Sequence, residues 1–404
     1  FYSKYVYMIL RISILLILLL LVPAFYIDRH FHLKKHRAFR FLLWGISGIF
    51  MAFTVWFCLY ENFSDTESLV KGQYLMLLLM WSCSTLLFTV VSATGWIFRK
   101  CRQAQRIRKL IDSVALIGGL SIAGSMLYGH ISGPEKLIVK TYTYQSASIP
   151  ASFDGFRIVQ LSDLHVGTFA NRKNIIRQIT DSVMSLQPDM IVFTGDLVNY
   201  HSGELDAFLP ILSKMKAPFG IYAVLGNHDY MNYRHWATGN DRKADIQRLI
   251  SLEKKMGWKV LLNENSVVRH QTDSMAIIGV ENDGKPPFPA RADLPRAQKG
   301  LQADCFSILL SHDPTHWRRA VLPTTNIPLT LSGHTHGMQL QFGHFSPASW
   351  FYPEWGGPYT ITERGIPRTL YVSLGTGEVL LPFRLGAWPE INVIILHHIP
   401  STQP

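Results

Sequence analysis

Cysteine is scarce in this 404-residue sequence, and its four cysteines lack the spacing of a disulfide framework or a zinc site. Acidic residues are also scarce in the first 130 residues, which contain 5 Asp and Glu against 14 Lys and Arg. The remaining residues hold 23 acidic and 25 basic side chains, so most of the net charge of +11 lies near the N-terminal end. The net charge of about +2 over the rest of the chain argues against a nucleic-acid partner.

The N-terminal third instead contains long apolar runs. Four stretches have the length of about 20 residues that crosses a bilayer, namely Val6–Tyr26, Phe41–Tyr60, Tyr74–Phe98 and Leu110–Gly129. The first is not a typical signal peptide, because no small-residue cleavage pattern follows it and three more spans come after it. We therefore expect residues 1–130 to form a transmembrane region, residues 131–150 a linker and first strand, and residues 151–404 a separate domain.

The loops between these runs differ in charge. Asp28–Arg40 and Arg99–Lys109 are rich in Lys and Arg, whereas Glu61–Gly72 is acidic. Short basic loops remain in the cytoplasm, so four spans place both chain ends outside. We expect a multi-pass protein of the bacterial cytoplasmic membrane, with its C-terminal domain outside the cytoplasm. The sequence begins at Phe1 rather than Met, and a preceding segment would leave this orientation unchanged, because the loops set it.

Polar residues follow five strand-like runs in the C-terminal domain. The runs are Phe156–Leu161, Met190–Thr194, Gly220–Leu225, Phe306–Leu310 and Leu329–Leu331, and the first three are each followed by a helical pattern. We expect strands Lys259–Leu262, Ser266–His270 and Met275–Val280 to form a meander. The strand ends present carboxylate, imidazole and amide groups, namely Asp163, His165, Asp196, Asn227, His228, His312, His334 and His336.

This set of groups is typical of a metal site. Nitrogen and oxygen ligands without a thiolate suit Mn, Fe or Zn. Two ions would need about three ligands each and a bridging carboxylate, and they would leave room for a bridging hydroxide. Each histidine taken alone also fits a satisfied polar residue, but five separate clusters at strand ends are not expected by chance.

The order of these blocks resembles the calcineurin-like metallophosphoesterase superfamily. The pattern D-x-H, G-D, G-N-H-D, H and G-H-x-H covers residues 150–400. Together with Pro382-Phe-Arg384 and Trp388-Pro-Glu390, it looks most like the membrane-associated bacterial branch. The resemblance implies an α/β fold, a four-layer α/β/β/α sandwich, here preceded by a transmembrane region of four helices. Met338 departs from the pattern, since the family usually has a second glycine there.

The resemblance also implies a role for each residue. Asp163, His165 and His336 would hold the first divalent ion, while Asn227, His312 and His334 would hold the second. Asp196 would bridge the two ions. The catalytic group would be His228, which stabilises the phosphoryl oxygens and protonates the leaving oxygen, with Asp229 orienting it.

The segment Phe342–Tyr359 is rich in aromatic residues and has two interpretations. It is either a hydrophobic lip that meets the bilayer or an acyl chain, or an aromatic minicore beneath a long loop. We expect hydrolysis of a phosphomonoester or phosphodiester, on a lipid-linked or envelope substrate. The alternatives are a nucleotide-sugar-lipid pyrophosphatase, a nucleotide or nucleic-acid phosphodiesterase, and a non-catalytic metal-binding membrane sensor.

Overall fold

The computed structural model describes residues 2–59, 68–98, 100, 102–286, 288, 290–302, 304–363 and 365–400. Of residues 2–13, 58, 59, 68, 69 and 363 it describes only the backbone. The chain divides into two compact units, residues 1–131 with 380–382, and residues 132–379 with 383–404.

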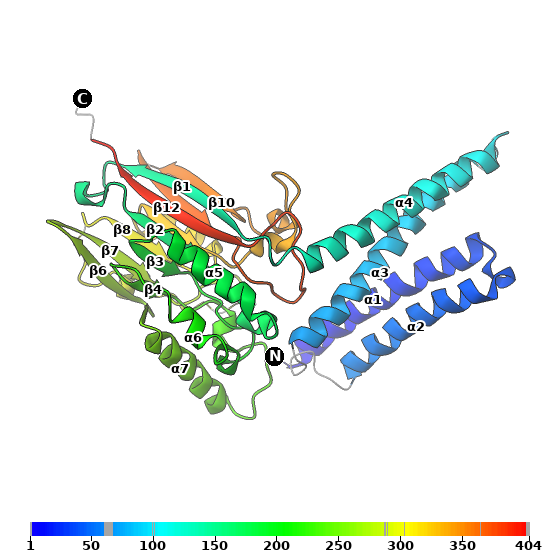
Figure 1. Ribbon diagram of the computed structural model, residues 1–404, viewed down its shortest axis with the longest axis horizontal. Helices are drawn as coiled ribbons and strands as arrows, with labels where there is room; N and C mark the ends of the chain where they lie inside the picture. Colours follow the sequence, from blue (N-terminus) through cyan, green and yellow to red (C-terminus); the bar gives the residue numbers. More distant parts are fainter. Residues whose placement is uncertain are drawn as a thin grey trace. The chain divides into compact units, whose positions relative to one another are not determined.

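The first unit is made of long helices (Figure 1), namely α1 (Tyr2–His30), α2 (Arg37–Leu59), α3 (Ser68–Thr94) and α4 (Ala104–Ile131). Three described stretches are long and apolar enough to cross a membrane: Arg37–Phe57, Val70–Phe98 and Ala104–Ile131. The start of the expected span Val6–Tyr26 lies on residues without described side chains. Residues 60–67 of the acidic loop also lie outside the described part.

Two acidic groups within these helices, Asp28 and Asp112, are paired, as burial away from water requires. Asp28 accepts hydrogen bonds from Arg40 and Trp44, both at 3.0 Å. The carboxylate of Asp112 lies 2.9 Å from His30 and accepts a hydrogen bond of 2.5 Å from Ser92. These contacts join α1 to α2, and α1 to α3 and α4.

The second unit contains two six-stranded mixed sheets (Figure 1). Sheet A has the order β1-β12-β2-β3-β4-β5, and sheet B has the order β10-β11-β9-β8-β7-β6. The strands of sheet A are β1 (Ile138–Ser146), β12 (Glu390–His398), β2 (Arg157–Leu161), β3 (Met190–Phe193), β4 (Ile221–Ala223) and β5 (Trp258–Val260). Those of sheet B are β10 (Gly357–Glu363), β11 (Ile366–Val372), β9 (Leu329–Ser332), β8 (Ser307–Leu310), β7 (Asp273–Gly279) and β6 (Glu264–His270).

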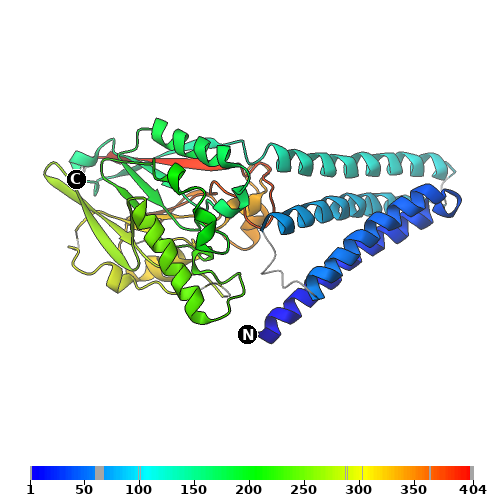
Figure 2. The same cartoon turned by 60° about the horizontal axis from the view of Figure 1, so that its bottom comes forward.

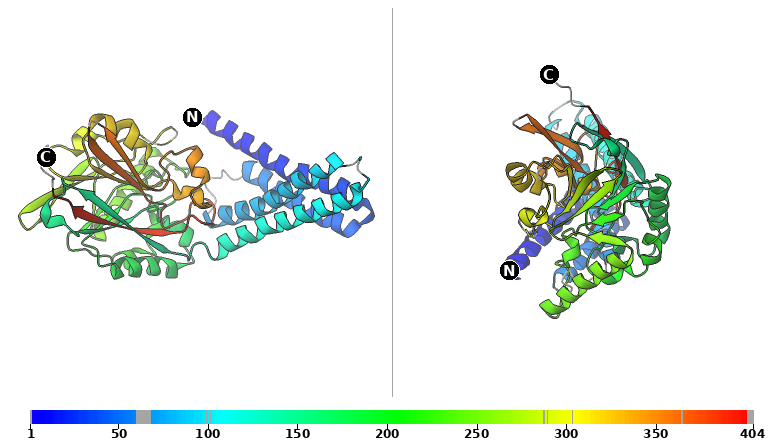
Figure 3. Two further views of the ribbon diagram at one scale, coloured as in Figure 1. Left: turned by 90° about the horizontal axis from the view of Figure 1, so that it is seen from above. Right: turned by 90° about the vertical axis from the view of Figure 1, so that its left-hand side faces the viewer.

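Alternation along the strands divides the core into layers. On β3, Met190 and Val192 face sheet B, whereas Ile191 and Phe193 pack beneath helices. Those helices, α5 (Lys173–Ser185) and α7 (Gly239–Lys255), cover the outer face of sheet A and appear green in Figure 2. A third cluster lies on the outer face of sheet B, under α8 (Leu294–Ala297) and the π-helix Trp317–Val321 (Figure 3). The expected α/β/β/α sandwich is confirmed.

Two local expectations are wrong. Strand β5 does not belong to a meander with β6 and β7, because it pairs in parallel with β4 in the other sheet. The helical pattern that follows Met190–Thr194 predicts a helix over about Glu204–Met215, but this helix is interrupted. The structure has a 3-10 turn at Ser202–Leu205 and a short α6 at Leu209–Leu212. The Glu204 carboxylate is used by the backbone instead, since it accepts the N–H groups of Asn199 and Tyr200 at 2.6 and 3.0 Å.

Candidate metal centre

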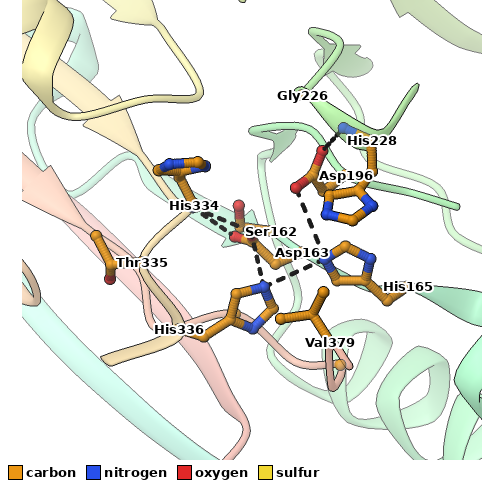
Figure 4. Close-up of polar contacts among 12 residues, drawn as sticks. Ser162, Asp163, His165, Asp196, Gly226, His228, His334, Thr335, His336 and Val379 are labelled. Atoms are coloured by element: carbon orange, nitrogen blue, oxygen red, sulfur yellow. Dashed lines mark hydrogen bonds and ion pairs between the residues drawn. The ribbon is translucent and has the colours of Figure 1, made fainter. Parts of the chain in front are cut away.

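Five strand ends bring the candidate ligands together. Strands β2, β3 and β4 are parallel neighbours in sheet A, and β8 and β9 are parallel neighbours in sheet B. Because parallel strands end at the same edge of a sheet, the loops that follow them meet. These loops carry Asp163, His165, Asp196, Asn227, His228, His312, His334 and His336 (Figure 4 shows six of them). Most of these side chains are nearly fully buried.

One group of side chains gathers around the end of β2. The Nε2 atoms of His165 and His336 lie 3.2 Å apart, and Nε2 of His336 lies 3.3 Å from Oδ1 of Asp163. The Oδ2 atom of Asp196 is 3.6 Å from Nε2 of His165 (Figure 4). Ligand atoms of Asp163, His165 and His336 all lie within 4.8 Å of one another, which is close enough to share one ion.

A second group lies between β4, β8 and β9. Nε2 of His312 is 3.2 Å from Oδ2 of Asp196 and 3.2 Å from Nδ1 of His334. The amide oxygen of Asn227 lies 2.8 Å from that Nδ1 and 3.1 Å from the His312 nitrogen. Asp196 is therefore close to both groups, as a bridging ligand would be.

The donors in both groups fit divalent cations. In each group two imidazole nitrogens face each other with carboxylate or amide oxygens beside them, and a cation satisfies all of these lone pairs together. In the second group the outer ring nitrogens have partners of the kind that orient metal-bound histidines. Nδ1 of His312 lies 2.7 Å from the carbonyl of Thr194, and Nε2 of His334 lies 2.9 Å from the Tyr352 hydroxyl.

The electrostatics of the site favour bound cations. Burial alone would raise the pKa of Asp163, but the adjacent His336 and His312 reverse this and hold the pKa below its usual range. Asp196 behaves in the same way, since His312 and His228 lower its pKa despite complete burial. Burial lowers the pKa of His165 and of His334. His312 is the exception, because burial alone would lower its pKa but Asp196 and Asp163 outweigh this and raise the pKa to about 10. The two anionic carboxylates therefore attract positive charge into the site.

His228 lies beside these groups. Its ring is perpendicular to that of His165, with the centroids 4.8 Å apart, and its backbone N–H donates to Oδ1 of Asp196 at 2.8 Å. A nitrogen of His228 is also close enough to His165 and Asp196 to form a third possible ligand group. Its Nδ1 atom lies 2.9 Å from the Asn199 carbonyl, which orients the ring.

Asp229 has different contacts from those expected. Its carboxylate does not bond the His228 ring but accepts four backbone N–H groups, from Asp196, Leu197, Val198 and Gly226, at 2.8 to 3.2 Å. Burial and the neighbouring Asp196 raise the pKa of Asp229 to about 7. Asp229 thus ties the loop after β3 to the loop after β4, and it acts on His228 only through the backbone.

Three further residues contact the candidate ligands. The Arg384 guanidinium is fully buried and lies 3.1 Å from Nδ1 of His336, while it also donates to the carbonyl groups of Leu374 and Ala387. The Tyr233 hydroxyl accepts a hydrogen bond from the Asn227 amide at 2.9 Å, and Tyr352 contacts His334. The sequence pattern Pro382-Phe-Arg384 pointed to Arg384 as a residue of interest. No spacing in the sequence predicted that Tyr233 or Tyr352 would contact the ligands.

The chain matches two family models. Residues 156–338 match the calcineurin-like phosphoesterase family, and residues 10–134 match a family described as a probable calcineurin-like phosphoesterase transmembrane domain. The second match agrees with the apolar helices of the first unit.

Similar proteins occur in bacteria and animals. The chain is 33% identical over 314 residues to the uncharacterized metallophosphoesterase YkuE of Bacillus subtilis, covering 74% of this chain and 98% of that protein. It is 30% identical over 276 residues to a transmembrane protein with metallophosphoesterase domain of Danio rerio, covering 67% of this chain and 60% of that one. An uncharacterized metallophosphoesterase of Campylobacter jejuni is 26% identical over 381 residues, covering 90% and 92%. The chain belongs to the calcineurin-like metallophosphoesterases and is a metal-dependent phosphoester hydrolase with a transmembrane domain.

Proposed function

We propose that this membrane protein holds two divalent ions and hydrolyses phosphomonoesters or phosphodiesters, with a lipid-linked or envelope compound as its substrate. One observation carries the proposal: seven ligand side chains from five strand ends form two groups that share Asp196. A single ion would leave one set of converging lone pairs without a partner, which is costly in a buried site.

The two ions would have separate ligands. The first would be held by Asp163, His165 and His336, the second by Asn227, His312 and His334, and Asp196 would contact both. Nitrogen and oxygen donors suit Mn, Fe or Zn. When bound, such ions supply an acidified water as nucleophile and positive charge for the phosphate oxygens.

We assign His228 to the substrate rather than to an ion. Its Nδ1–H is used by the Asn199 carbonyl, so Nε2 is the nitrogen that remains for the reaction. With both ring nitrogens protonated, His228 would donate Nε2–H to a phosphoryl oxygen and transfer that proton to the leaving oxygen, becoming neutral. The Tyr233 ring, 4.3 Å from the imidazole between centroids, and the Asn199 carbonyl hold the ring in this position.

Two features of the chain support this substrate class. The chain carries apolar helices, and the aromatic segment Phe342–Tyr359 contributes the Tyr352 hydroxyl that contacts His334. The C-terminal part has almost no net charge, which does not favour nucleic acid. A phosphoester that is itself attached to lipid fits both observations.

The full-length chain, purified in detergent, stripped of metal and reloaded with Mn, Fe or Zn, tests the proposal. We expect two equivalents of bound metal per chain and hydrolysis of chromogenic phosphomonoesters or phosphodiesters. In a second assay, at least one compound from a panel of lipid phosphates should be hydrolysed faster than these chromogenic esters. A preferred nucleotide or nucleotide-sugar-lipid diphosphate would instead support the corresponding alternative.

Ligand variants separate an enzyme from a metal-binding sensor. Asn227→Ala and His336→Ala should each lower kcat/KM by more than about 100-fold, because even outer-shell partners of a metal are worth 10- to 100-fold. The matched control is His397→Ala, whose side chain is 47% exposed and pairs with Asp154. If wild type and the two ligand variants are equally inactive with every metal, the catalytic proposal is wrong.

The orientation of the catalytic domain has an independent test. Basic loops favour a C-terminal domain outside the cytoplasm. A reporter fused after Pro404 should therefore be active only if it functions in the periplasm. If only a reporter that functions in the cytoplasm is active, the catalytic domain lies inside and the predicted orientation is wrong.

A further inference from the structure

Five large apolar side chains near the metal centre are exposed. Trp350 is 72% exposed, Phe351 63%, Phe342 60%, Met338 48% and Phe345 44%. We call this set the aromatic surface. An aromatic minicore would bury these side chains, so their exposure favours the other interpretation, although Tyr352, Trp355 and Tyr359 of the same segment are partly buried. Grouped exposed apolar residues mark an interaction site.

The composition of the aromatic surface indicates a lipid partner. Residues 338–353 contain no Lys, Arg, Asp or Glu. The next acidic residue, Glu354, is buried and paired with Arg318 at 2.5 Å. A segment that exposes tryptophan and phenylalanine and carries no charged side chain is favoured at the boundary between lipid headgroups and acyl chains.

The aromatic surface is presented by an ordered backbone. The backbone groups of Phe342 and Phe345 exchange hydrogen bonds of 2.8 and 3.0 Å, and the Ser346 hydroxyl donates to the Gly337 carbonyl at 2.6 Å. Residue 341 donates its N–H to the Leu385 carbonyl at 2.8 Å. The side chains therefore project from a fixed frame, which lowers the entropy cost of docking.

Met338 adds an independent indication. Its φ of 46° is in the left-handed region, which costs a non-glycine residue roughly 1–2 kcal/mol. Glycine would adopt this conformation without the cost. The methionine side chain is half exposed, so at this strained position it adds apolar area to the surface rather than to the core.

Chain connectivity brings a bilayer within reach of this surface. Helix α4 ends at Ile131 and β1 begins at Ile138, so the six residues between them span at most about 20 Å. At the start of β1, the N–H of Ile138 donates a hydrogen bond to the carbonyl of Pro389. Nearby in sequence, Leu385 exchanges backbone hydrogen bonds with residues 339 and 341. The orange segment of the aromatic surface thus lies at the end of the domain where β1 and β12 begin (Figures 1 and 3).

We propose that the aromatic surface inserts into the headgroup region of the bilayer that holds the chain's own helices. Tyr352 follows Phe351 directly and contacts His334, so insertion would also position the metal centre against the lipid surface. This surface goes beyond the proposed function and does not depend on which phosphoester is hydrolysed.

Fluorescence of the full-length chain in vesicles tests the insertion. Phosphatidylcholine with brominated acyl chains quenches tryptophans that enter the bilayer, and the difference between wild type and Trp350→Phe isolates Trp350. We expect bromolipid to lower the Trp350 signal at least about twofold, and aqueous iodide to leave it unchanged. The control is Val267→Trp, at a 48% exposed position of β6 on the opposite edge of sheet B, where iodide alone should quench.

Two results would overturn the proposal. Quenching of Trp350 by iodide and not by bromolipid would leave the surface in water. Protection from both quenchers would place it against protein, such as a second copy of the chain. Since neither readout requires activity, an inactive wild type would count against the proposed hydrolysis and not against insertion.

Discussion

Gly226 offers a stringent test of the metal centre, because it has no room for a side chain. It joins β4 to Asn227, and a Cβ atom at this position would lie 2.6 Å from the backbone nitrogen of Asp196 and 2.7 Å from its Cγ. Ordinary contact begins at 3.4 Å, so Gly226→Ala is too close to the Asp196 nitrogen by about 0.8 Å, and it is closer still to Oδ1 of the same residue. Its φ is not left-handed, and the conflict is therefore one of space alone.

The atoms that must move belong to the residue shared by both ligand groups. Oδ2 of Asp196 is 3.2 Å from His312 and 3.6 Å from His165, so a shift of its loop disturbs both groups at once. A displacement near 1 Å in an active site costs about 100-fold in rate. We expect Gly226→Ala to lower kcat/KM by about that factor, equivalent to about 2.7 kcal/mol of transition-state stabilisation, with weaker metal binding.

The assay compares kcat/KM on a chromogenic phosphoester and bound metal per chain in full-length protein. The matched control is Gly239→Ala, at the first residue of α7, where a Cβ would meet nothing within 4 Å. Near-ultraviolet circular dichroism establishes that both variants are folded. If Gly226→Ala retains the metal content and turnover of Gly239→Ala, the close approach of Gly226 to Asp196 does not matter to the reaction.

Three further changes give distinct results. Burial raises the pKa of Glu253, so the contribution of this residue to the free energy of unfolding decreases as pH rises above about 4.5. Glu253→Gln should therefore gain stability relative to wild type between pH 5 and pH 8, measured by thermal unfolding. Arg384→Lys loses the planar fork that contacts His336, and calorimetric titration should show metal affinity 10- to 100-fold lower. Tyr352→Phe removes the hydroxyl that contacts Nε2 of His334, so calorimetric titration should show metal affinity about 10-fold lower, and unfolding in denaturant should show a loss of about 1 kcal/mol.

The strand ends of the metal centre could be predicted from sequence because each carries its own local signal. A short apolar run followed by glycine, carboxylate or histidine marks both the buried strand and the ligand after it, as in β3 and Asp196. Parallel strands then place such ends together without any knowledge of side-chain contacts. For this reason all eight candidate residues could be named before their distances were known.

Contacts between distant segments left no such signal. Three residues of β5 pair with β4 in sheet A although their sequence neighbours form a hairpin in sheet B. Strand β10 starts within the aromatic segment, where glycine and proline conceal its pattern. Likewise Tyr233 and Tyr352 reach the candidate ligands through loops whose course is decided by tertiary packing, so neither residue could be assigned from spacing.

Backbone strain links the fold to the chemistry. Thirteen described non-glycine residues have positive φ, and five of them are candidate ligands, namely Asp163, His165, Asp196, His334 and His336. Each such conformation costs of the order of 1–3 kcal/mol and persists only where the surrounding structure imposes it. Glycine would remove the strain but also the ligand atom. The hydrogen bonds from backbone N–H groups to Asp229, and those of Arg384, hold the loops that carry these residues. The left-handed backbone conformation is therefore kept at these ligand positions because the side chain is needed there, although glycine would fit the backbone better.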